Sequence, residues 1–302
     1  MKHHYVPQFL LRRWVNPAGK VQVITVRNGR VVAKARAPEY TGYENQLYAL
    51  VANAVGLSED ALERSVFGPI DSDAAVALEK LEAHQAITED DHVAWTFFLS
   101  SLRMRQPDVL DFLRTEGLER LRRDLADRDK DTLPPGAPST EQWFEEHFPG
   151  HMQAATLASW LPRMILHDGV LDRFGSLRWW IQEFTPDLPE LLLSDLPIHW
   201  EGGFNQAGFL IQLPIAPNRV FFGAASGQTE QFLSQIGHAE LIARINRTTL
   251  ASSSHRVWAR GTDARDFVES NLAHMGKNAF PFSSLLPRLE MTHGETEEIA
   301  AK

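Results

Sequence analysis

The chain of 302 residues is long enough to bury a sizeable core, as one large domain or two small ones, and its 43% hydrophobic and 23% charged residues are ordinary for a globular protein. It has no cysteine, which excludes disulfides, thiolate metal sites and thiol nucleophiles, so any metal must be held by His, Asp, Glu or water. The net charge of −9 argues against a broad nucleic-acid-binding face but is compatible with a local basic groove.

The first residues, MKHHYVPQ, lack the apolar core of a signal peptide, and no apolar run approaches the roughly 20 residues that cross a bilayer. We therefore expect a cytoplasmic protein without a membrane partner. Pro7 suits the first position of a helix, where its missing N–H loses no hydrogen bond. Side chains alternate in an extended segment, so at most one of His3 and His4 is expected to face any one pocket.

A β-hairpin is predicted next, because Asn28-Gly29 separates the β-rich runs VQVITV (21–26) and VVAKARA (31–37), and a tight turn needs positive φ at both central residues. We expect this hairpin to pack against a helical block. That block is predicted to begin with a short helix from Ser58 to Phe67, which Gly68-Pro69 interrupts. A second helix follows and ends near Gln85.

The clearest helix follows Thr88, which forms a capping box with Asp91, and Pro107 is expected to kink it. Arg105 falls inside the apolar arc of this helix, whereas Arg103 lies outside it. A buried guanidinium must be paired, and Glu63 and Asp71 are the candidate partners. A structural ion pair and a functional site are both consistent with this position.

The second half of the chain changes character after the linker-like LPPGAPST (133–140) and helices around 141–148 and 151–167. The runs SLRWWIQEF, LLLSD, GFLIQLPI and RVFFGA are short and β-rich, and they predict an antiparallel sheet. Helices over 228–245 and near 263–274 follow. We therefore predict an α+β fold: one domain over 1–286, with a possible sub-unit boundary near 131–140, and a disordered tail over 287–302.

Two short stretches near the end are ambiguous. Ser194-Asp195 follows a buried strand, which is typical both of a functional position and of an ordinary turn. His255 and Arg256 lie together on a β-like run that could bind phosphate or nothing. The sequence contains no Gly-rich phosphate loop, no zinc-binding His-Glu-x-x-His and no nucleophile elbow, and it marks no base for the serines at 252–254.

Seven blocks occur in an order that resembles the bacterial family called domain of unknown function 4238, over roughly residues 3–260. The blocks are HHYVPQFLLRRW, YENQLY, LERSVFGPID, LRMRQPDVL, LLLSDLPI, LIQLPIAPNRVFFG and INRTTLASSSHRVWA. The first block carries the hallmark His-His-x-x-Pro-Gln, and Leu196 departs from the family, which often has a polar residue there. The resemblance supplies positions but no reaction, since the family has no established activity. The implied positions are His3, His4, Pro7, Gln8, Asn45, Glu63, Asp71, Arg105, Ser194, Asp195 and Asn246.

Three functions fit this polar set. The first is a phosphodiesterase or nuclease acting on a nucleic acid or nucleotide, with a histidine as base or metal ligand, a divalent ion as a possible cofactor, and Arg105 on a phosphoryl oxygen. The second is a non-enzymatic regulatory module that binds a ligand or a partner, and the third is a purely structural polar core. The predicted catalytic residues are His3, His4, Glu63, Arg105 and Asp195. The predicted binding residues are Gln8, Asn45, Asp71, Ser194 and Asn246.

Overall fold

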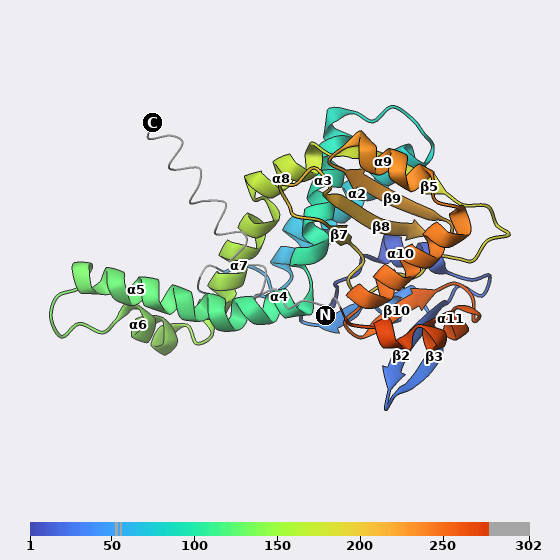
Figure 1. Cartoon of the computed structure of the whole chain (residues 1–302). Helices are drawn as coiled ribbons and strands as arrows, with labels where there is room; N and C mark the ends of the chain where they lie inside the picture. Colours follow the sequence, from blue (N-terminus) through green and yellow to red (C-terminus); the bar gives the residue numbers. More distant parts are fainter. Residues whose placement is uncertain (52–53, 55, 278–302) are drawn as a thin grey trace, which may run out of the picture.

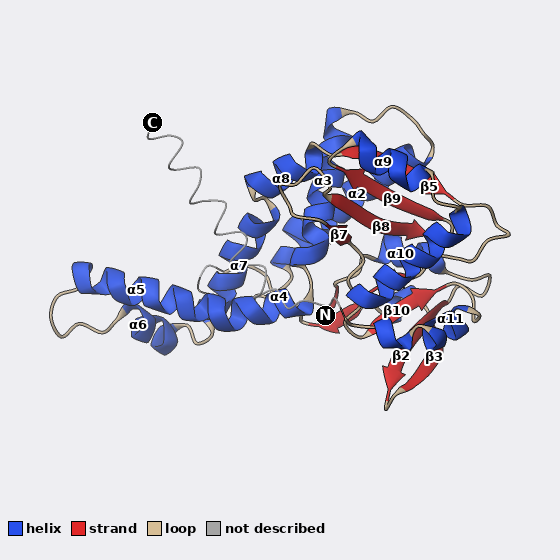
Figure 2. Cartoon of the chain, in the orientation of Figure 1, coloured by secondary structure: helices blue, strands red, loops and turns tan. Residues whose placement is uncertain are grey.

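The computed structural model describes residues 1–51, 54 and 56–277 of the chain. About half of the structure is helical and 18% is strand, and all strand pairs in this part of the chain are antiparallel. Figures 1 and 2 show the helices of the first half on one side and the strands, with α9 to α11, on the other. The α+β class is therefore confirmed.

Most apolar side chains of the N-terminal segment are buried in the core. His3 is the middle residue of a short strand that pairs with a second one, as expected for an extended segment. Pro7 immediately precedes a single helical turn whose Leu10 and Leu11 are fully buried. The elements of the N-terminal segment are β1 (Lys2–His4), α1 (Gln8–Leu11) and η1 (Arg12–Trp14). After the hairpin, η2 (Pro38–Tyr40) leads to β4 (Tyr43–Asn45), the strand that pairs with β1.

The helical block differs from the prediction at Gly68-Pro69, where the helix continues. A π-helical turn, η3 (Glu63–Phe67), runs directly into α2 (Gly68–Glu82), and the Gly68 N–H donates to the Glu63 carbonyl five residues earlier. A Cβ at position 68 would lie 2.9 Å from that carbonyl oxygen, so glycine permits the widened turn. The π turn also accommodates Pro69, which lacks the N–H of a regular α-helical turn.

The next helix, α3 (Glu89–Met104), begins with the predicted capping box, in which Asp91 N–H donates to the Thr88 hydroxyl and the Asp91 carboxylate accepts from Thr88 N–H. It ends before Pro107, which starts a new helix instead of kinking the old one. Gln106, the residue before the proline, is extended, because the proline ring disfavours the helical conformation there.

A helical arm extends from the body of the protein (Figure 1). Residues 133–139, the linker-like stretch, connect its two helices, α5 and α6, at the tip. Few of its side chains are buried: Leu118 in α5 and none in α6. The helices from here are α4 (Pro107–Phe112), η4 (Leu113–Gly117), α5 (Leu118–Thr132), α6 (Thr140–His147), α7 (His151–Ile165) and α8 (Asp168–Gly175).

One four-stranded sheet has the order β5-β9-β8-β7 and is covered on both faces. Phe221 packs with Trp95 of α3 on one face, and Phe222 packs with Ile242 of α10 on the other. All seven residues of β8 are therefore buried, which explains the continuous apolar run in the sequence. The strands are β5 (Arg178–Glu183), β7 (His199–Glu201), β8 (Leu210–Ala216) and β9 (Arg219–Ala224).

The predicted hairpin is confirmed as β2 (Val21–Arg27) and β3 (Arg30–Arg36), with φ of 50° at Asn28 and 72° at Gly29. It does more than pack against helices, because β2 pairs with β10 (Arg256–Ala259) from the other end of the chain. The sheet order is β3-β2-β10-β6, with β6 spanning Leu193–Ser194. This pairing brings residues near 25 beside residues near 256.

The last helices cover the two larger sheets. The helix predicted over 228–245 is two helices, α9 (Gly227–Ser234) and α10 (His238–Ser252), separated at Gly237. They are followed by α11 (Ala264–Ser270) and η5 (Leu272–His274). The tail predicted over 287–302 lies outside the described residues. Within the described ranges, no helix is both long and apolar enough to span a membrane.

Candidate functional site

Arg105 immediately follows α3, and its side chain is fully buried. Its terminal nitrogens donate to the Asp71 carboxylate of α2 at 3.0 and 2.8 Å, and one of them also donates to Ser101 Oγ at 2.7 Å. The guanidinium lies over the Phe67 ring, 4.7 Å from its centroid. The predicted pairing is confirmed, with Asp71 as the partner. Burial lowers the pKa of Arg105, but Asp71, together with Tyr48 and Glu63, outweighs this and raises the pKa above its ordinary value.

Arg103 is not on the outside of the helix, so this part of the prediction is wrong. Its side chain is 8% exposed, and its terminal nitrogens donate to the Asp108 carboxylate at 2.9 and 2.6 Å. The prediction assumed one continuous helix through Pro107. Because α4 begins at that proline, its first turn brings Asp108 to the Arg103 guanidinium.

Tyr48 joins several of the predicted residues, although no pattern assigned it a role. The His3 ring stacks on the Tyr48 ring with centroids 4.2 Å apart, and the Tyr48 hydroxyl donates to the Glu63 carboxylate. The Tyr48 ring also packs against the Phe67 ring, with centroids 4.5 Å apart. His3, Glu63 and the Arg105–Asp71 pair are thus gathered around one buried tyrosine. The signal that could have identified it is the polar-aromatic block YENQLY.

The contacts of His3 determine which nitrogen of its neutral ring carries the proton. Its Nδ1 accepts the main-chain N–H of Tyr48 at 3.1 Å, so the proton is assigned to Nε2. Burial, the N-terminal amino group and Arg114 lower the pKa of His3 and favour this neutral ring, although Asp60 opposes them. Nε2 is buried and lacks a hydrogen-bond partner among the described residues. This arrangement makes His3 a hydrogen-bond donor, which suits an electrostatic role better than that of a base.

His4 lies on the opposite side of β1, away from Tyr48. Its Nδ1 is 3.4 Å from the side-chain nitrogen Nε2 of Gln8, and the side-chain oxygen Oε1 of Gln8 accepts from Arg12 at 2.9 Å. Burial, together with the Lys2 and Arg12 charges, lowers the pKa of His4 to about 4. Asn45 is exposed on β4, opposite Lys2 in the strand register. The predicted residues His4, Gln8 and Asn45 therefore do not join the cluster around Tyr48.

We expect the low pKa of His4 to make stability depend on pH. The unfolded chain takes up a proton at His4 below about pH 6.5, whereas the folded protein does so only near its pKa of about 4. The free energy of unfolding should therefore fall as the pH drops through this window. Urea unfolding of wild type and His4→Gln from pH 7.5 to 4.5 measures the effect as the difference between the two curves. The exposed His147→Gln should retain the wild-type slope, and an unchanged slope in His4→Gln would contradict the prediction.

Asp195 organises a different part of the fold. Its carboxylate accepts the main-chain N–H groups of Ser254, His255 and Arg256 at 2.8, 2.7 and 3.1 Å, and so fixes the backbone that leads into β10. Burial raises the pKa of Asp195, and the three donors, which favour the carboxylate, oppose that rise. Ser194 Oγ donates to the Leu196 carbonyl at 2.7 Å within the turn.

Asn246 connects α10 to the segment before β6. Its side-chain oxygen accepts the Leu192 N–H at 2.8 Å, and its nitrogen donates to the Glu190 carbonyl at 2.9 Å. Both partners are main-chain groups of the same chain, so the amide is occupied in holding that segment. The binding role predicted for Asn246 stays a prediction.

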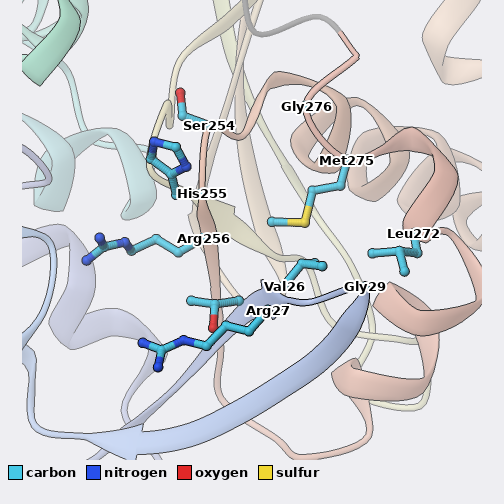
Figure 3. Close-up of a pocket in the computed structure, with 10 residues that line it drawn as sticks. Val26, Arg27, Gly29, Ser254, His255, Arg256, Leu272, Met275 and Gly276 are labelled. Carbon is cyan, nitrogen blue, oxygen red and sulfur yellow. The ribbon is translucent and has the colours of Figure 1, made fainter.

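A groove of about 560 Å³ opens where the hairpin, the start of β10 and η5 meet. Arg256 lies opposite Thr25 in the strand register, so Arg27, two residues further along β2, is its diagonal neighbour on the same sheet face. Figure 3 shows both arginine side chains extending to one side, with His255 above them and Met275 across the strands. Within the described ranges, neither guanidinium forms an ion pair with a carboxylate. The lining residues are Thr25, Val26, Arg27, Gly29, Ser254, His255, Arg256, Leu272, Met275 and Gly276.

The carboxylates among the predicted site residues are already engaged by protein groups. Asp71 accepts from Arg105, and Glu63 accepts from Tyr48. Asp195 accepts from three main-chain N–H groups. In the part of the chain that the structure describes, no three His, Asp or Glu side chains gather as metal ligands. The divalent ion therefore stays a prediction, and the described residues provide no set of ligands for it.

The chain was compared with family models, curated proteins and solved structures. No curated protein and no solved structure matches the chain. A family model described as protein of unknown function (DUF4238) matches residues 2–263. That match includes the N-terminal strand, the cluster around Tyr48, Asp195 and the start of β10. Because it spans most of the 302 residues, the chain belongs to the DUF4238 family.

Proposed function

We propose that this protein is a binding module for a small phosphate-bearing ligand of the nucleotide class, held in the groove between β2, β10 and η5. The observation that carries the proposal is the pair Arg27 and Arg256, diagonal neighbours on one sheet face, neither of which forms an ion pair among the described residues. Arg256 lies over the Tyr5 ring, 6.0 Å from its centroid, and its charge acts on the Asp195 carboxylate. Two like charges at neighbouring positions repel each other. A bound phosphate would offset this repulsion, because it accepts hydrogen bonds from two guanidinium groups at once.

The rest of the groove supports a ligand with both a charged and an apolar part. Val26, Leu272 and Met275 contribute apolar surface, and Figure 3 shows Leu272 and Met275 across the strands from the two arginine side chains. The volume of about 560 Å³ falls in the range of small-ligand pockets. A nucleotide would place its phosphate on the arginines and reach past the start of β10 to the apolar residues with its base, whereas free phosphate would leave those residues unused.

Binding is better supported than hydrolysis at the residues that the sequence singles out. A general base needs a free lone pair near the reacting group. Glu63, Asp71 and Asp195 each accept hydrogen bonds from protein groups, as described above, and the neutral His3 presents a donor at Nε2. Asp195 would then act as a positioning residue, since it holds the backbone of Ser254 to Arg256 that lines the groove.

Arg27→Gln and Arg256→Gln are each expected to weaken the binding of a fluorescent N-methylanthraniloyl ATP by about tenfold or more, because a hydrogen bond to a charged group contributes about 1.5–3 kcal/mol. Fluorescence titration of the full chain at two salt concentrations measures the loss. Arg36→Gln is the matched control, since Arg36 is exposed on β3 of the same sheet but does not line the groove. It should leave binding within about twofold, as expected for a distant screened charge.

Competition with unlabelled ligands tests which chemical class of ligand the groove binds. Inorganic triphosphate and adenosine should each displace the probe less well than ATP, because each lacks one half of the contacts. A single-stranded DNA 12-mer that displaces the probe better than ATP would indicate a nucleic-acid site instead. Binding that is absent in wild type, or equal in Arg27→Gln, Arg256→Gln and Arg36→Gln, would contradict the proposal.

A further inference from the structure

A serine, a histidine and a glutamate lie in line where the end of α10 meets β7. The Ser252 hydroxyl is 2.7 Å from His199 Nδ1, and the opposite ring nitrogen, Nε2, is 3.7 Å from the Glu201 carboxylate. The sequence marks no base for the serines at 252–254, and the fold supplies one from 53 residues away. We propose that Ser252, His199 and Glu201 form a nucleophilic site that acts on small carboxylic esters.

The two elements explain why these side chains meet. His199 and Glu201 are two residues apart on β7, so their side chains point to the same face of the strand. Ser252 is the last residue of α10 and is buried, with 6% of its surface exposed. The imidazole therefore lies between the hydroxyl and the carboxylate, which is the order required of a base that is oriented by an acid.

The hydrogen bonds of the serine decide whether it can be activated. A serine inside a helix ordinarily donates to the carbonyl four residues earlier, and Ser252 Oγ is 3.0 Å from the Thr248 carbonyl. The contact with His199 Nδ1 is shorter, at 2.7 Å, so the imidazole competes for the single hydroxyl proton. When Nδ1 accepts that proton, Nε2 carries the ring's other proton and lies 3.7 Å from a Glu201 carboxylate oxygen.

The glutamate is in the right charge state to support this transfer. The contact with His199 holds the pKa of Glu201 below its ordinary value although burial opposes it, so the carboxylate is ionised at neutral pH. A carboxylate beside the ring stabilises the imidazolium that forms when the hydroxyl gives up its proton. The His199 side chain is 17% exposed, so a small substrate can reach this face from solvent.

The reaction would proceed in two balanced halves. Ser252 Oγ attacks the ester carbonyl carbon while Nδ1 of His199 takes the hydroxyl proton, and collapse of the adduct breaks the bond to the leaving alkoxide, which takes that proton. Water then attacks the acyl-serine carbonyl and gives its proton to the same nitrogen. The Ser252 oxygen leaves, recovers the proton and releases the carboxylic acid.

A fluorophosphonate probe tests the nucleophile without knowledge of the substrate. Ser252 Oγ forms a bond to phosphorus, fluoride leaves, and His199 takes the hydroxyl proton. Mass spectrometry of the intact full chain and of its peptides should show one adduct on Ser252. Ser252→Ala should abolish it, and Ser234→Ala, at an exposed serine at the end of α9, should label at the wild-type rate. His199→Ala should slow labelling at least 100-fold, as expected for loss of a general base.

Glu201→Gln provides a second measure if His199→Ala does not fold, because it removes the carboxylate charge and keeps the serine and the imidazole. It should slow labelling about tenfold. Absence of an adduct on Ser252, or labelling at the wild-type rate in His199→Ala or in Glu201→Gln, would each overturn the proposal. Ligand binding in the groove between β2, β10 and η5 is measured separately and does not bear on this result.

Discussion

Asp71→Asn is expected to lower the free energy of unfolding by about 3–5 kcal/mol, because it leaves an uncompensated charge in the core. Arg105 is fully buried, and a guanidinium does not lose its proton at any ordinary pH. The Asp71 carboxylate accepts from both of its terminal nitrogens and is itself 26% exposed. The asparagine retains the shape and removes the charge. Urea midpoints with an unchanged slope would measure the loss.

The asymmetry of this pair gives a sharper test. Arg105→Leu leaves Asp71 at the edge of the core, where water can solvate its carboxylate, so it should destabilise the protein less than Asp71→Asn does. Asp127→Asn is the matched control, since Asp127 and Lys130 form an exposed pair on α5, and water screens pairs of this kind so that they contribute little to stability. If Asp71→Asn is as mild as Asp127→Asn, the burial argument is wrong.

Asp195→Asn is expected to have the second large effect, through the backbone instead of through a buried charge. One carboxylate accepts three main-chain N–H groups, and an amide nitrogen in its place would face donors. Leaving buried donors unsatisfied costs about 1–3 kcal/mol each, so we expect a loss of about 2–4 kcal/mol. Amide hydrogen exchange should accelerate at Ser254, His255 and Arg256, and nucleotide binding in the groove should weaken.

Ser194→Ala is the control for this change, because Ser194 is the preceding residue and its hydroxyl donates to the Leu196 carbonyl, not to the backbone of 254–256. It should cost about 1 kcal/mol and leave exchange at 254–256 unchanged. If Asp195→Asn loses stability while exchange at these three amides stays protected, the carboxylate does not hold this backbone, and its assignment as a positioning residue is wrong.

The residues around Tyr48 show how far sequence reasoning extends into the site. The apolar arc of α3 was enough to predict that Arg105 is buried and paired, because an unpaired buried charge is too costly to retain. The same helical periodicity gave a wrong prediction for Arg103, because Pro107 starts a new helix whose first turn brings Asp108 to this arginine. The central position of Tyr48 could not be predicted, because its main-chain N–H donates to His3, which lies 45 residues earlier in the sequence.

By itself, the sequence determined the features that depend on a few neighbouring residues. These include the hairpin, where Asn28-Gly29 supplies positive φ, the capping box at Thr88, and the antiparallel α+β class. Only the tertiary structure decided which distant groups meet: Arg27 beside Arg256 through the β2–β10 register, and Ser252 with His199. The physical reason is the distance along the chain over which each kind of interaction acts. Backbone torsions and helical periodicity act over about four residues, whereas these pairs depend on how whole elements pack.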